Sequence, residues 1–474
     1  MCTSCRIGAV KPTLILTMKI SELPYQQNSA KLFSLVADEP WSIFFDSGFP
    51  EIDMGRYDII VSRPVVTLET FGNITHINYN GKETTSSEDP LMLLNRYLGE
   101  KSINFSGLPF CGGAVGYLSY DLGRRLEILP EMSEQDIKMP EMAVGIFDWS
   151  LIVDHHLRRI WLVSFCRFDK TESIWGELHE LFSSPTNRET KGYRIISNVK
   201  SNLSRDQYGL AFDKVKNYIR NGDCYQVNLS QRFAADFEGD SWSAYLKLRT
   251  VNPAPYSAYL NLPTGTVLSS SPERFLRVID NQVETKPIKG TIHRSIFAYE
   301  DKALADCLLE SEKDRAENLM IVDLLRNDIS KVCKSGSVLV PKLFALETYA
   351  TVHHLVSTIT GRLAENKNSI DLLRGCFPGG SITGAPKLRS MEIIEELEPH
   401  RRSIYCGSIF YLGFDKNMDS NICIRTLVNY NNQLYFNAGG GIVWDSNVDA
   451  EYKECFDKAA AILKLFDQEK TNWL

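Results

Sequence analysis

The order of the predicted elements indicates an α+β protein built on large antiparallel β-sheets. Strand-like segments, either alternating or continuously apolar, follow one another through the first half of the chain. In the second half, strands occur in groups between amphipathic helices. This order favours the α+β class over a doubly wound parallel sheet, in which strands and helices alternate regularly.

Strands dominate the first half. They are expected over 41–45, 58–62 and 65–71, and in a hairpin of 151–154 with 160–165. A helix is expected over 90–98. The most polar interior stretch, 183–204, is interpreted as a linker. The division that follows is an extension over 1–24, of which the residues before Met18 are expected to contribute little to the fold, an N-terminal region over 25–182 and a second region over 204–467.

Both helices and strands are expected after the linker. Ser204 caps a helix that Gly222 closes. Further helices are expected over 311–327, from Pro386 onward and over 450–466. The expected strands cover 266–279, 282–287, 404–414, 421–430 and 433–443.

Composition excludes several classes of function. The 474 residues include 52 Lys plus Arg against 59 Asp plus Glu, so the net charge of −7 argues against a nucleic-acid binder. No apolar run approaches the roughly 18 residues of a membrane span. The 11 cysteines are expected to be mostly buried and reduced, and Cys2 and Cys5 to belong to a frayed tail. We therefore expect a cytoplasmic protein that binds neither nucleic acid nor membrane.

Two acidic pairs are candidate metal ligands. Glu451 and Glu454 lie three residues apart on one face of the last helix. Asp314 and Glu317 have the same spacing on the helix expected over 311–327. Each pair has an ordinary alternative: a solvated face with a Glu454–Lys458 ion pair, or an acid-rich first turn. Face to face, the pairs would supply the oxygen ligands that Mg²⁺ prefers.

Two further residues are candidates for acid–base and nucleophilic chemistry. Lys289 lies between Pro287 and Gly290 on a stiff strand end, although a solvated surface lysine is the ordinary interpretation. Glu273 lies among small residues, where burial would raise its pKa and suit a general acid. The alternative for Glu273 is a surface pair with Arg274.

Three other features suggest anion binding. The glycine-rich segment 377–387 does not match the P-loop pattern but opens a helix, whose N-terminus suits a carboxylate. Residues 438–441 either expose backbone N–H groups or form a turn at a strand end. Arg425 has apolar neighbours, and a buried arginine needs an anion. Of His353 and His354, one is expected to be structural and the other exposed.

These segments together resemble the chorismate-utilising enzymes, a family that includes anthranilate, isochorismate, salicylate and aminodeoxychorismate synthases. The second half carries GDCYQVNLSQRF (222–233), SPERF (271–275), PIKGT (287–291), DRAENLMIVDLLRNDI (314–329), HHLVSTITG (353–361), FPGGSITGAPK (377–387), IRT (424–426), AGGGIV (438–443) and EYKECFDKA (451–459). The first half carries FFDSG (44–48), RYDIIVSRP (56–64) and GGAVGYLSYDLGRR (112–125). The resemblance implies the fold of anthranilate synthase component I, with large antiparallel sheets, helices packed outside them and a chorismate-binding domain over 204–467.

Two positions select among members of the family. Water-using relatives have a lysine where this chain has Gln226, and anthranilate synthases typically have Ala in place of Lys289. The residues at both positions are similar to those of the aminodeoxychorismate synthases. Those enzymes convert chorismate and ammonia to 4-amino-4-deoxychorismate for 4-aminobenzoate and folate synthesis. An anthranilate-forming enzyme is the nearest alternative, and an inactive tryptophan-sensing scaffold is a more distant one.

The resemblance also implies a role for each site residue. Lys289 is the covalent nucleophile and Glu273 the general acid. Mg²⁺ is held by Glu317 and Glu454, with Asp314 and Glu451 acting through water. The substrate-binding residues are Thr291, His354, Tyr405, Arg425, Gly439, Gly440, Gly441 and Lys458.

A partner and a second ligand follow from the same resemblance. The sequence has no glutaminase nucleophile motif, since Cys224 and Cys455 lie inside synthase motifs, so a separate glutamine amidotransferase subunit would supply the ammonia. Relatives bind tryptophan in a pocket of the N-terminal region. The matching residues are Ser47, Met54, Gly55, Arg56, Tyr57, Pro255, Tyr256 and Ser257.

Overall fold

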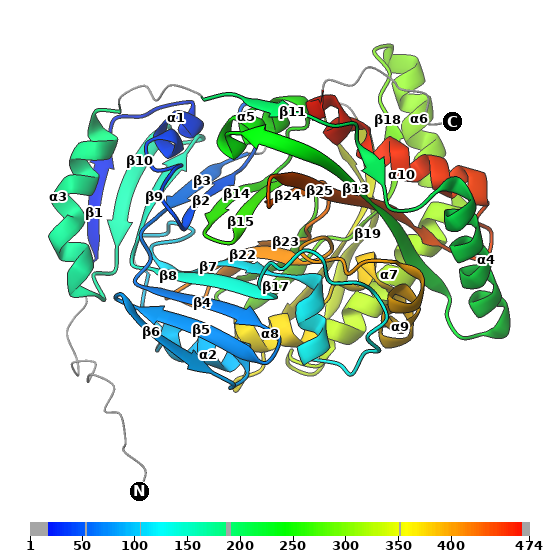
Figure 1. The fold of residues 1–474 in the computed structure, drawn as a ribbon, viewed down its shortest axis with the longest axis horizontal. Helices are drawn as coiled ribbons and strands as arrows, with labels where there is room; N and C mark the ends of the chain where they lie inside the picture. The colour runs from blue at the N-terminus through cyan, green and yellow to red at the C-terminus, as the bar shows by residue number, and fades with distance from the viewer. Residues whose placement is uncertain (1–17, 53–54, 105, 186–190, 350–351, 467–474) are drawn as a thin grey trace, which may run out of the picture.

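The computed structural model describes residues 18–52, 55–104, 106–185, 191–349 and 352–466. Cys2, Cys5 and most of the expected extension lie outside the described residues. The described part forms two antiparallel sheets of 13 and 12 strands, with helices around them (Figure 1). The α+β architecture expected from the order of elements is confirmed.

The first sheet runs in the order β1 (Lys19–Leu23), β10 (Arg159–Ser164), β9 (Trp149–Asp154), β3 (Tyr57–Val61), β2 (Ser42–Asp46), β14 (Tyr256–Leu262), β15 (Gly265–Ser271), β24 (Thr426–Tyr430), β25 (Gln433–Ile442), β13 (Gln226–Gly239) and β11 (Tyr193–Ile195). The short strands β12 (Lys200–Ser201) and β21 (Gly384–Ala385) also pair with β13.

The second sheet runs in the order β18 (Ile288–His293), β20 (Val352–Arg362), β17 (Gln282–Thr285), β16 (Arg274–Ile279), β23 (Met418–Asn421), β22 (Ser408–Gly413), β7 (Gly113–Leu118), β8 (Met142–Phe147), β4 (Val66–Phe71), β5 (Ile74–Tyr79) and β6 (Lys82–Ser86). Strand β19 (Leu339–Thr348) pairs with β20.

The helices are α1 (Ser29–Ser34), α2 (Pro90–Leu98), α3 (Asp169–Ser183), α4 (Arg205–Asn221), α5 (Ser241–Val251), α6 (Ala298–Glu310), α7 (Glu312–Ser330), α8 (Ser369–Cys376), α9 (Lys387–Leu397) and α10 (Val448–Leu463). Three short 3₁₀ helices are η1 (Tyr120–Arg125), η2 (Gly380–Ile382) and η3 (Lys464–Phe466). The predicted start of α4 is confirmed: Ser204 and Gln207 form a capping box, and Gly222 ends the helix at φ +81°.

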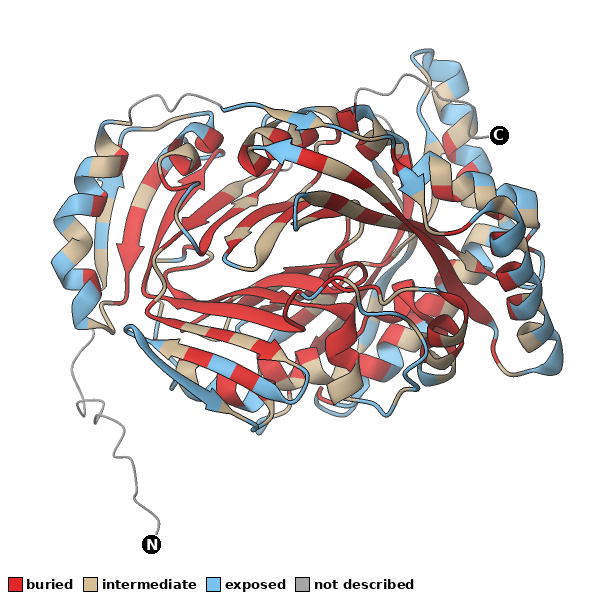
Figure 2. Ribbon diagram, in the orientation of Figure 1, coloured by how far each residue is buried: buried red, intermediate tan, exposed pale blue. Residues whose placement is uncertain are grey.

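The main apolar core lies between the two sheets, where buried residues line both inner faces (Figure 2). A second core covers the outer face of the first sheet, where Phe33 of α1, Phe182 of α3 and Trp242 of α5 are buried against strand residues. A third core joins α4, α9 and α10 to β13 and β25. Amphipathic helices therefore pack outside the sheets, as their periodicity predicts.

The two predicted regions interleave in both sheets. Strand β14 pairs with β2, and β22 pairs with β7. Strands β11 and β12 lie inside the stretch interpreted as a linker, and both pair with β13. The division between 25–182 and 204–467 is thus one of sequence, because neither region has a sheet of its own.

Two predicted strands are wrong, because each is divided between the sheets. The segment 266–279 forms β15 in the first sheet and β16 in the second, with Pro272 and Glu273 between them. The segment 421–430 forms β23 and β24 in the same way, and Arg425 takes a left-handed conformation (φ +51°) in the connection. Proline has no N–H for a ladder, and left-handed backbone leaves the strand conformation, so each connection can cross between sheets.

The two connections lie beside each other. The backbone N–H of Ile422 donates to the Glu273 carbonyl at 3.0 Å, and that of Ser270 donates to the Arg425 carbonyl at 3.1 Å. The expected strand 404–414 is likewise shorter, since β22 begins only at Ser408 and residues 404–407 form a turn. Glu273, Arg425 and Tyr405 are therefore carried on connections rather than on strands.

No helix in the described part of the chain is both long enough and apolar enough to span a membrane.

Candidate active site

Glu273 is a buried carboxyl with few hydrogen-bond donors. Its side chain is 6% exposed, and the Ser381 hydroxyl donates to Oε1 at 3.2 Å. Burial raises the pKa of Glu273 to about 7, against the opposing effects of Lys289 and of the Ser381 hydrogen bond. A surface pair with Arg274 is excluded, because Arg274 binds Asp419 at 3.0 Å instead. Glu273 can therefore carry a proton near neutral pH.

Lys289 lies on β18 with its ammonium nitrogen facing the same serine. Nζ donates to the Ser381 carbonyl at 3.2 Å. Burial lowers the pKa of Lys289, the charge of Lys458 lowers it further, and the acidic neighbours Glu317 and Glu273 oppose the change. The solvated-lysine alternative is thus wrong, and the site favours the neutral amine.

Gly290 allows β18 to approach α7. Its φ is +81°, and a Cβ there would lie 3.0 Å from the Cβ of Asp314. Lys286, three residues before Lys289, instead pairs with Glu347 at 2.8 Å. Of these two lysines, Lys289 therefore lies beside the acidic cluster and Lys286 pairs with Glu347.

The two predicted acidic pairs lie close enough to influence each other. Burial, then Asp314 and Glu451, raise the pKa of Glu317, although Lys289 and Lys313 lower it. Burial also raises the pKa of Glu451, whose Oε1 accepts from the Ser446 hydroxyl at 2.6 Å. Helices α7 and α10 thus bring four carboxyl groups to one side of Lys289.

One ordinary alternative for α10 also holds. Lys458 lies 2.7 Å from Glu454 and donates to the Gly439 carbonyl at 3.0 Å. Burial opposes ionisation of Glu454, yet Lys458 and Lys313 hold its pKa below the usual range. The intrahelical pair and the acidic cluster therefore coexist.

The cluster fits a hard divalent cation in its donor chemistry. Carboxylate oxygens are the donors that Mg²⁺ prefers, and the metal usually keeps several waters. Gly440 leaves room for these oxygens, since a Cβ there would lie 2.9 Å from Oε2 of Glu451. As they stand, no three His, Cys, Asp or Glu side chains in the described ranges are close enough to hold a metal. Metal binding thus stays a prediction here.

Arg425 is the one predicted anion-binding residue that lacks any counter-charge. Burial lowers its pKa, and within the described ranges its guanidinium makes no hydrogen bond or ion pair. Its charge, after burial, helps lower the pKa of His354 to about 4. His354 Nδ1 lies 2.8 Å from the Thr291 hydroxyl. Arg425, neutral His354 and Thr291 therefore form a place where an anion is missing.

The glycines of 439–441 lie inside β25, so the strand-end turn is wrong. Opposite them on β13, the Ser230 N–H donates to Glu398 and the Asn228 N–H to the Thr383 carbonyl. The pairs with Gly439 and Gly441 are consequently non-hydrogen-bonded ones, whose N–H groups point away from β13. Strand β24 leaves this edge at Phe436. The amides of Gly439 and Gly441 thus face an open edge, and that of Gly440 faces β13.

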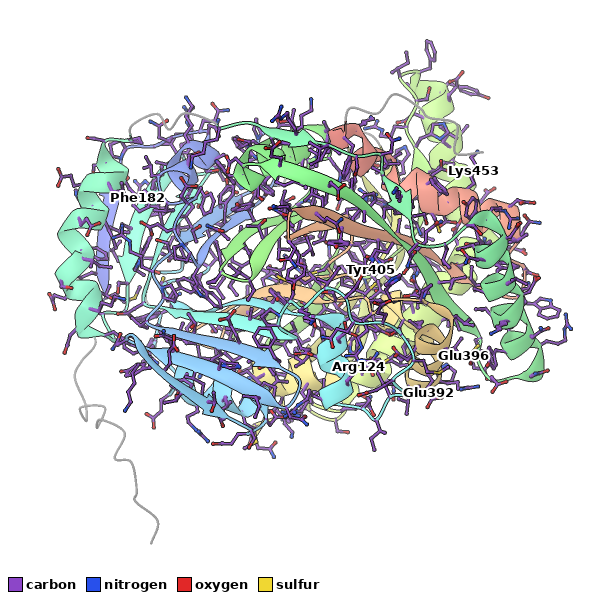
Figure 3. All side chains as sticks on the ribbon, viewed as in Figure 1. Arg124, Phe182, Glu392, Glu396, Tyr405 and Lys453 are labelled. Carbon is purple, nitrogen blue, oxygen red and sulfur yellow. The ribbon has the colours of Figure 1, made fainter. Side chains whose placement is uncertain are left out.

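Tyr405 lies in the middle of the molecule, between the two sheets (Figure 3). It is 6% exposed, and the guanidinium of Arg402 lies 5.6 Å from its ring centroid. Arg402 is itself buried, pairs with Glu398 at 2.7 Å and donates to the Ile382 carbonyl at 3.0 Å. The turn that carries Tyr405 is thereby tied to the glycine-rich segment.

The remaining histidine expectation is wrong, because both side chains are buried. His353 is 3% exposed and lies 3.1 Å from Asp301 and 2.9 Å from Thr348. His354 is 7% exposed. Alternation along β20 places the two on opposite faces, each with its own partners.

Of the residues matched to a tryptophan pocket, Ser47 contacts a buried carboxylate, Asp58. The backbone N–H and hydroxyl of Ser47 both donate to Asp58 at 2.7 Å, and a Cβ on Gly55 would lie 2.7 Å from the Ser47 carbonyl. Arg56 pairs with Asp154 at 3.0 Å. The Ser257 hydroxyl donates to the Ala254 carbonyl, and the Arg274 guanidinium lies over the Tyr256 ring. Met54 lies outside the described residues. Tryptophan binding stays a prediction.

A cavity of about 370 Å³ opens beside this region, lined by Arg56, Tyr57, Asp154 and Trp161 among others. None of its lining residues belongs to the set around Lys289.

The functional contacts that sequence reasoning missed are those of Ser381 and Arg402. Ser381 lies in a segment that the sequence analysis interpreted as an anion site. The one sequence signal for its buried contacts is the neighbouring Pro378, Gly379 and Gly380, which allow close packing.

Comparison with known proteins agrees with this geometry. The family model described as chorismate binding enzyme matches residues 53–464. Aminodeoxychorismate synthase component 1 of Escherichia coli (strain K12) is 49% identical over 457 residues, which cover 96% of this chain and 99% of that protein. The protein of that name from Bacillus subtilis (strain 168) is 38% identical, with 88% and 91% covered. Anthranilate synthase component 1 of Acetivibrio thermocellus is also 38% identical, with 87% of each chain covered.

A solved structure shows the same fold. Anthranilate synthase component I from Streptococcus pneumoniae TIGR4 matches with a TM-score of 0.77 and 32% identity, over 86% of this chain and 92% of that one. The fold implied by the resemblance, two large antiparallel sheets with helices outside them, is confirmed.

Proposed function

Because the chain belongs to the family of chorismate binding enzymes, in the group that contains aminodeoxychorismate synthase component 1, we propose that it converts chorismate and ammonia to 4-amino-4-deoxychorismate. The observation that carries the proposal is the meeting of two oppositely shifted groups at Ser381. Glu273 there has a raised pKa and Lys289 a lowered one. Such a pair suits an acid and a nucleophile that act together.

In the first step, the neutral amine of Lys289 bonds to C2 of chorismate. The ring double bond shifts, the C4–O bond breaks, and Glu273 gives its proton to the departing hydroxyl, which leaves as water. In the second step, ammonia bonds to C4, the double bond shifts back, the C2–N bond to Lys289 breaks, and the proton that the new amine loses returns to Glu273. The net change is chorismate plus ammonia to 4-amino-4-deoxychorismate plus water, and the lysine is regenerated.

Two sets of groups support the binding of a dianionic substrate. Arg425, with no counter-charge of its own, and the open amides of Gly439 and Gly441 suit one carboxylate. Thr291 lies beside His354, which is neutral there, and Tyr405 is included on the family resemblance. Asp314, Glu317, Glu451 and Glu454 would hold Mg²⁺, which would supply positive charge for the other carboxylate.

Ammonia must come from elsewhere, because the candidate thiols in the synthase motifs are poor nucleophiles. Cys224 and Cys455 are buried, and burial raises the pKa of each to about 11. Relatives are named as component 1, which fits a second component. We propose a glutamine amidotransferase subunit in that role.

The test is incubation of the purified chain with chorismate, Mg²⁺ and an ammonium salt at pH 8. The expected product is 4-amino-4-deoxychorismate, which an added aminodeoxychorismate lyase converts to 4-aminobenzoate. Acid-quenched protein is expected to carry the mass of chorismate less one water, on the peptide that contains Lys289. Anthranilate formed without the lyase would overturn the proposal in favour of the related reaction.

A further inference from the structure

The glycine-rich segment 377–387 has no role in the reaction as described so far. The predicted anion site is not what its structure shows, since residues 376–385 are all buried. A Cβ on Gly380 would lie 2.5 Å from Leu324 Cδ2, so α7 packs directly on the backbone of η2. The segment is a closed part of the core that reaches the catalytic pair.

Four hydrogen bonds hold this segment from both sides. The Arg402 guanidinium donates to the Ile382 carbonyl at 3.0 Å, and the Asn228 N–H donates to the Thr383 carbonyl at 2.8 Å. The Thr383 hydroxyl donates to the Gly379 carbonyl at 3.0 Å. The Lys387 ammonium donates to the Cys376 carbonyl at 2.8 Å and so ties the two ends together. The backbone position of the residue at the centre is therefore fixed.

That central residue, Ser381, is 5% exposed and contacts both members of the catalytic pair. Its hydroxyl donates to Oε1 of Glu273, and its carbonyl accepts from Nζ of Lys289, each at 3.2 Å. The acid comes from the connection between β15 and β16, and the amine comes from β18 in the second sheet. Ser381 thus contacts both groups, and the backbone N–H of Ile288, next to Lys289 on β18, also hydrogen-bonds to the Glu273 carboxyl.

We propose that Ser381 is a positioning residue that sets the directions of proton transfer and of nucleophilic attack. The inference rests on the proposed function and adds to it. An oxygen that accepts a hydrogen bond is the poorer site for a proton, so the Ser381 hydrogen bond disfavours protonation of Oε1 of Glu273. A neutral amine has two N–H bonds and one lone pair, and an N–H held by the Ser381 carbonyl turns that lone pair away from the segment.

The other charges around the pair come from different elements and stay constant when Ser381 changes. Glu273 faces Lys289 of β18 and Lys458 of α10. Lys289 faces Lys458 and Glu454 of α10 and Glu317 of α7. A substitution of Ser381 therefore removes one hydroxyl and leaves this electrostatic setting and the backbone carbonyl in place.

The experiment compares Ser381→Ala with Ser381→Thr and with the matched control Thr383→Val, all in the full chain with ammonium as nitrogen donor. Ser381→Ala is expected to lower kcat about 10- to 100-fold with little change in KM for chorismate. Its kcat is also expected to fall at a higher pH than that of the parent chain, because a hydrogen bond that favoured the ionised carboxylate is gone. Ser381→Thr, which keeps a hydroxyl, is expected to restore the parent pH profile.

Thr383→Val removes a buried hydroxyl from the same segment without touching Glu273 or Lys289. It is expected to keep the parent pH profile even where its Tm falls. If Ser381→Ala does not fold, Ser381→Cys makes the same comparison with a weak donor in place of the hydroxyl.

Two results would overturn the inference: a parent-like kcat and pH profile in Ser381→Ala, or the same profile shift in Thr383→Val. The second would mean that the segment acts only by general packing. Failure of the proposed function is distinguishable, because the parent chain itself would then form neither product nor adduct.

Discussion

Asp58 and Glu273 are both buried carboxyls, in the N-terminal region and in the candidate active site, and their pKa values shift in opposite directions. Asp58 accepts from the Ser29 hydroxyl at 2.5 Å and from the N–H and hydroxyl of Ser47 at 2.7 Å, and His155 Nε2 lies 2.8 Å away. Burial alone would raise the pKa of Asp58, but these partners hold it below the usual range. Glu273 has too few donors, and burial raises its pKa to about 7.

The difference distinguishes a buried polar cluster that stabilises the fold from one that suits a ligand. Around Asp58 the polar groups satisfy one another, so the cluster is complete without a ligand. Around Glu273 the groups are left over: Arg425 has no anion, carboxyls of α7 and α10 crowd together, and Lys289 favours its neutral form. Unmatched buried groups cost free energy, and they mark where a ligand completes the structure.

The largest expected effect is on the nucleophile. Lys289→Ala is expected to lower turnover about 10³-fold or more, since it removes the covalent step, while chorismate binding by titration calorimetry stays within a few-fold of the parent value. Lys286→Ala is the matched control, because Lys286 pairs with Glu347 and should tolerate the change in turnover assays. Parent-like turnover by Lys289→Ala with no trapped adduct would remove the lysine from the mechanism.

The second effect concerns the acid. Glu273→Gln is expected to lower kcat about 10²- to 10³-fold, and kcat of the parent chain should fall as pH rises above about 7. Stability should respond in the same sense. The folded pKa of Glu273 lies above its unfolded value of about 4.5, so its favourable contribution is present at pH 4 and is lost between about pH 4.5 and 7.

The Tm of Glu273→Gln relative to the parent chain is therefore expected to be higher at pH 8 than at pH 5. Differential scanning calorimetry at the two pH values measures this. An identical Tm difference at both would show that Glu273 does not titrate on folding.

The third effect tests the completed cluster. Asp58→Ala leaves the donors of Ser29, Ser47 and His155 without their acceptor, and should lower the free energy of unfolding by about 3 kcal/mol in urea titrations. Since the pKa of Asp58 is lowered, its contribution is present above pH 4 and is lost as pH falls further. A large loss of kcat in well-folded Asp58→Ala would mean that the two regions are coupled.

The smallest expected effect is on the metal. Glu454→Gln should weaken Mg²⁺ binding about tenfold, measured by calorimetry without chorismate, because one of the two carboxylates expected to bind the metal directly is neutralised. Glu312→Gln, an exposed acid on α7, is the control for net charge alone. Equal Mg²⁺ affinity in Glu454→Gln and Glu312→Gln would remove Glu454 from the ligand set.

Local sequence signals predicted most single elements and the chemical type of most site residues. The capping box at Ser204, the hairpin of β9 with β10 and the acidic stripe of α10 depend on neighbours within about seven residues, which periodicity and caps report directly. These local signals failed at Pro272 and Arg425, where a predicted strand is divided between the two sheets. Which sheet each part joins depends on packing against distant strands, and local periodicity does not report that packing.

The sequence by itself determined the α+β class, the four acids, the lysine and the arginine. Only the tertiary structure decided their surroundings: that Lys289 is desolvated, that the Arg425 guanidinium has no ion pair within the described residues, and that Ser381 contacts both acid and amine. Burial, pKa and hydrogen bonds across the sheets depend on chain segments more than 90 positions apart, whose approach no local pattern encodes.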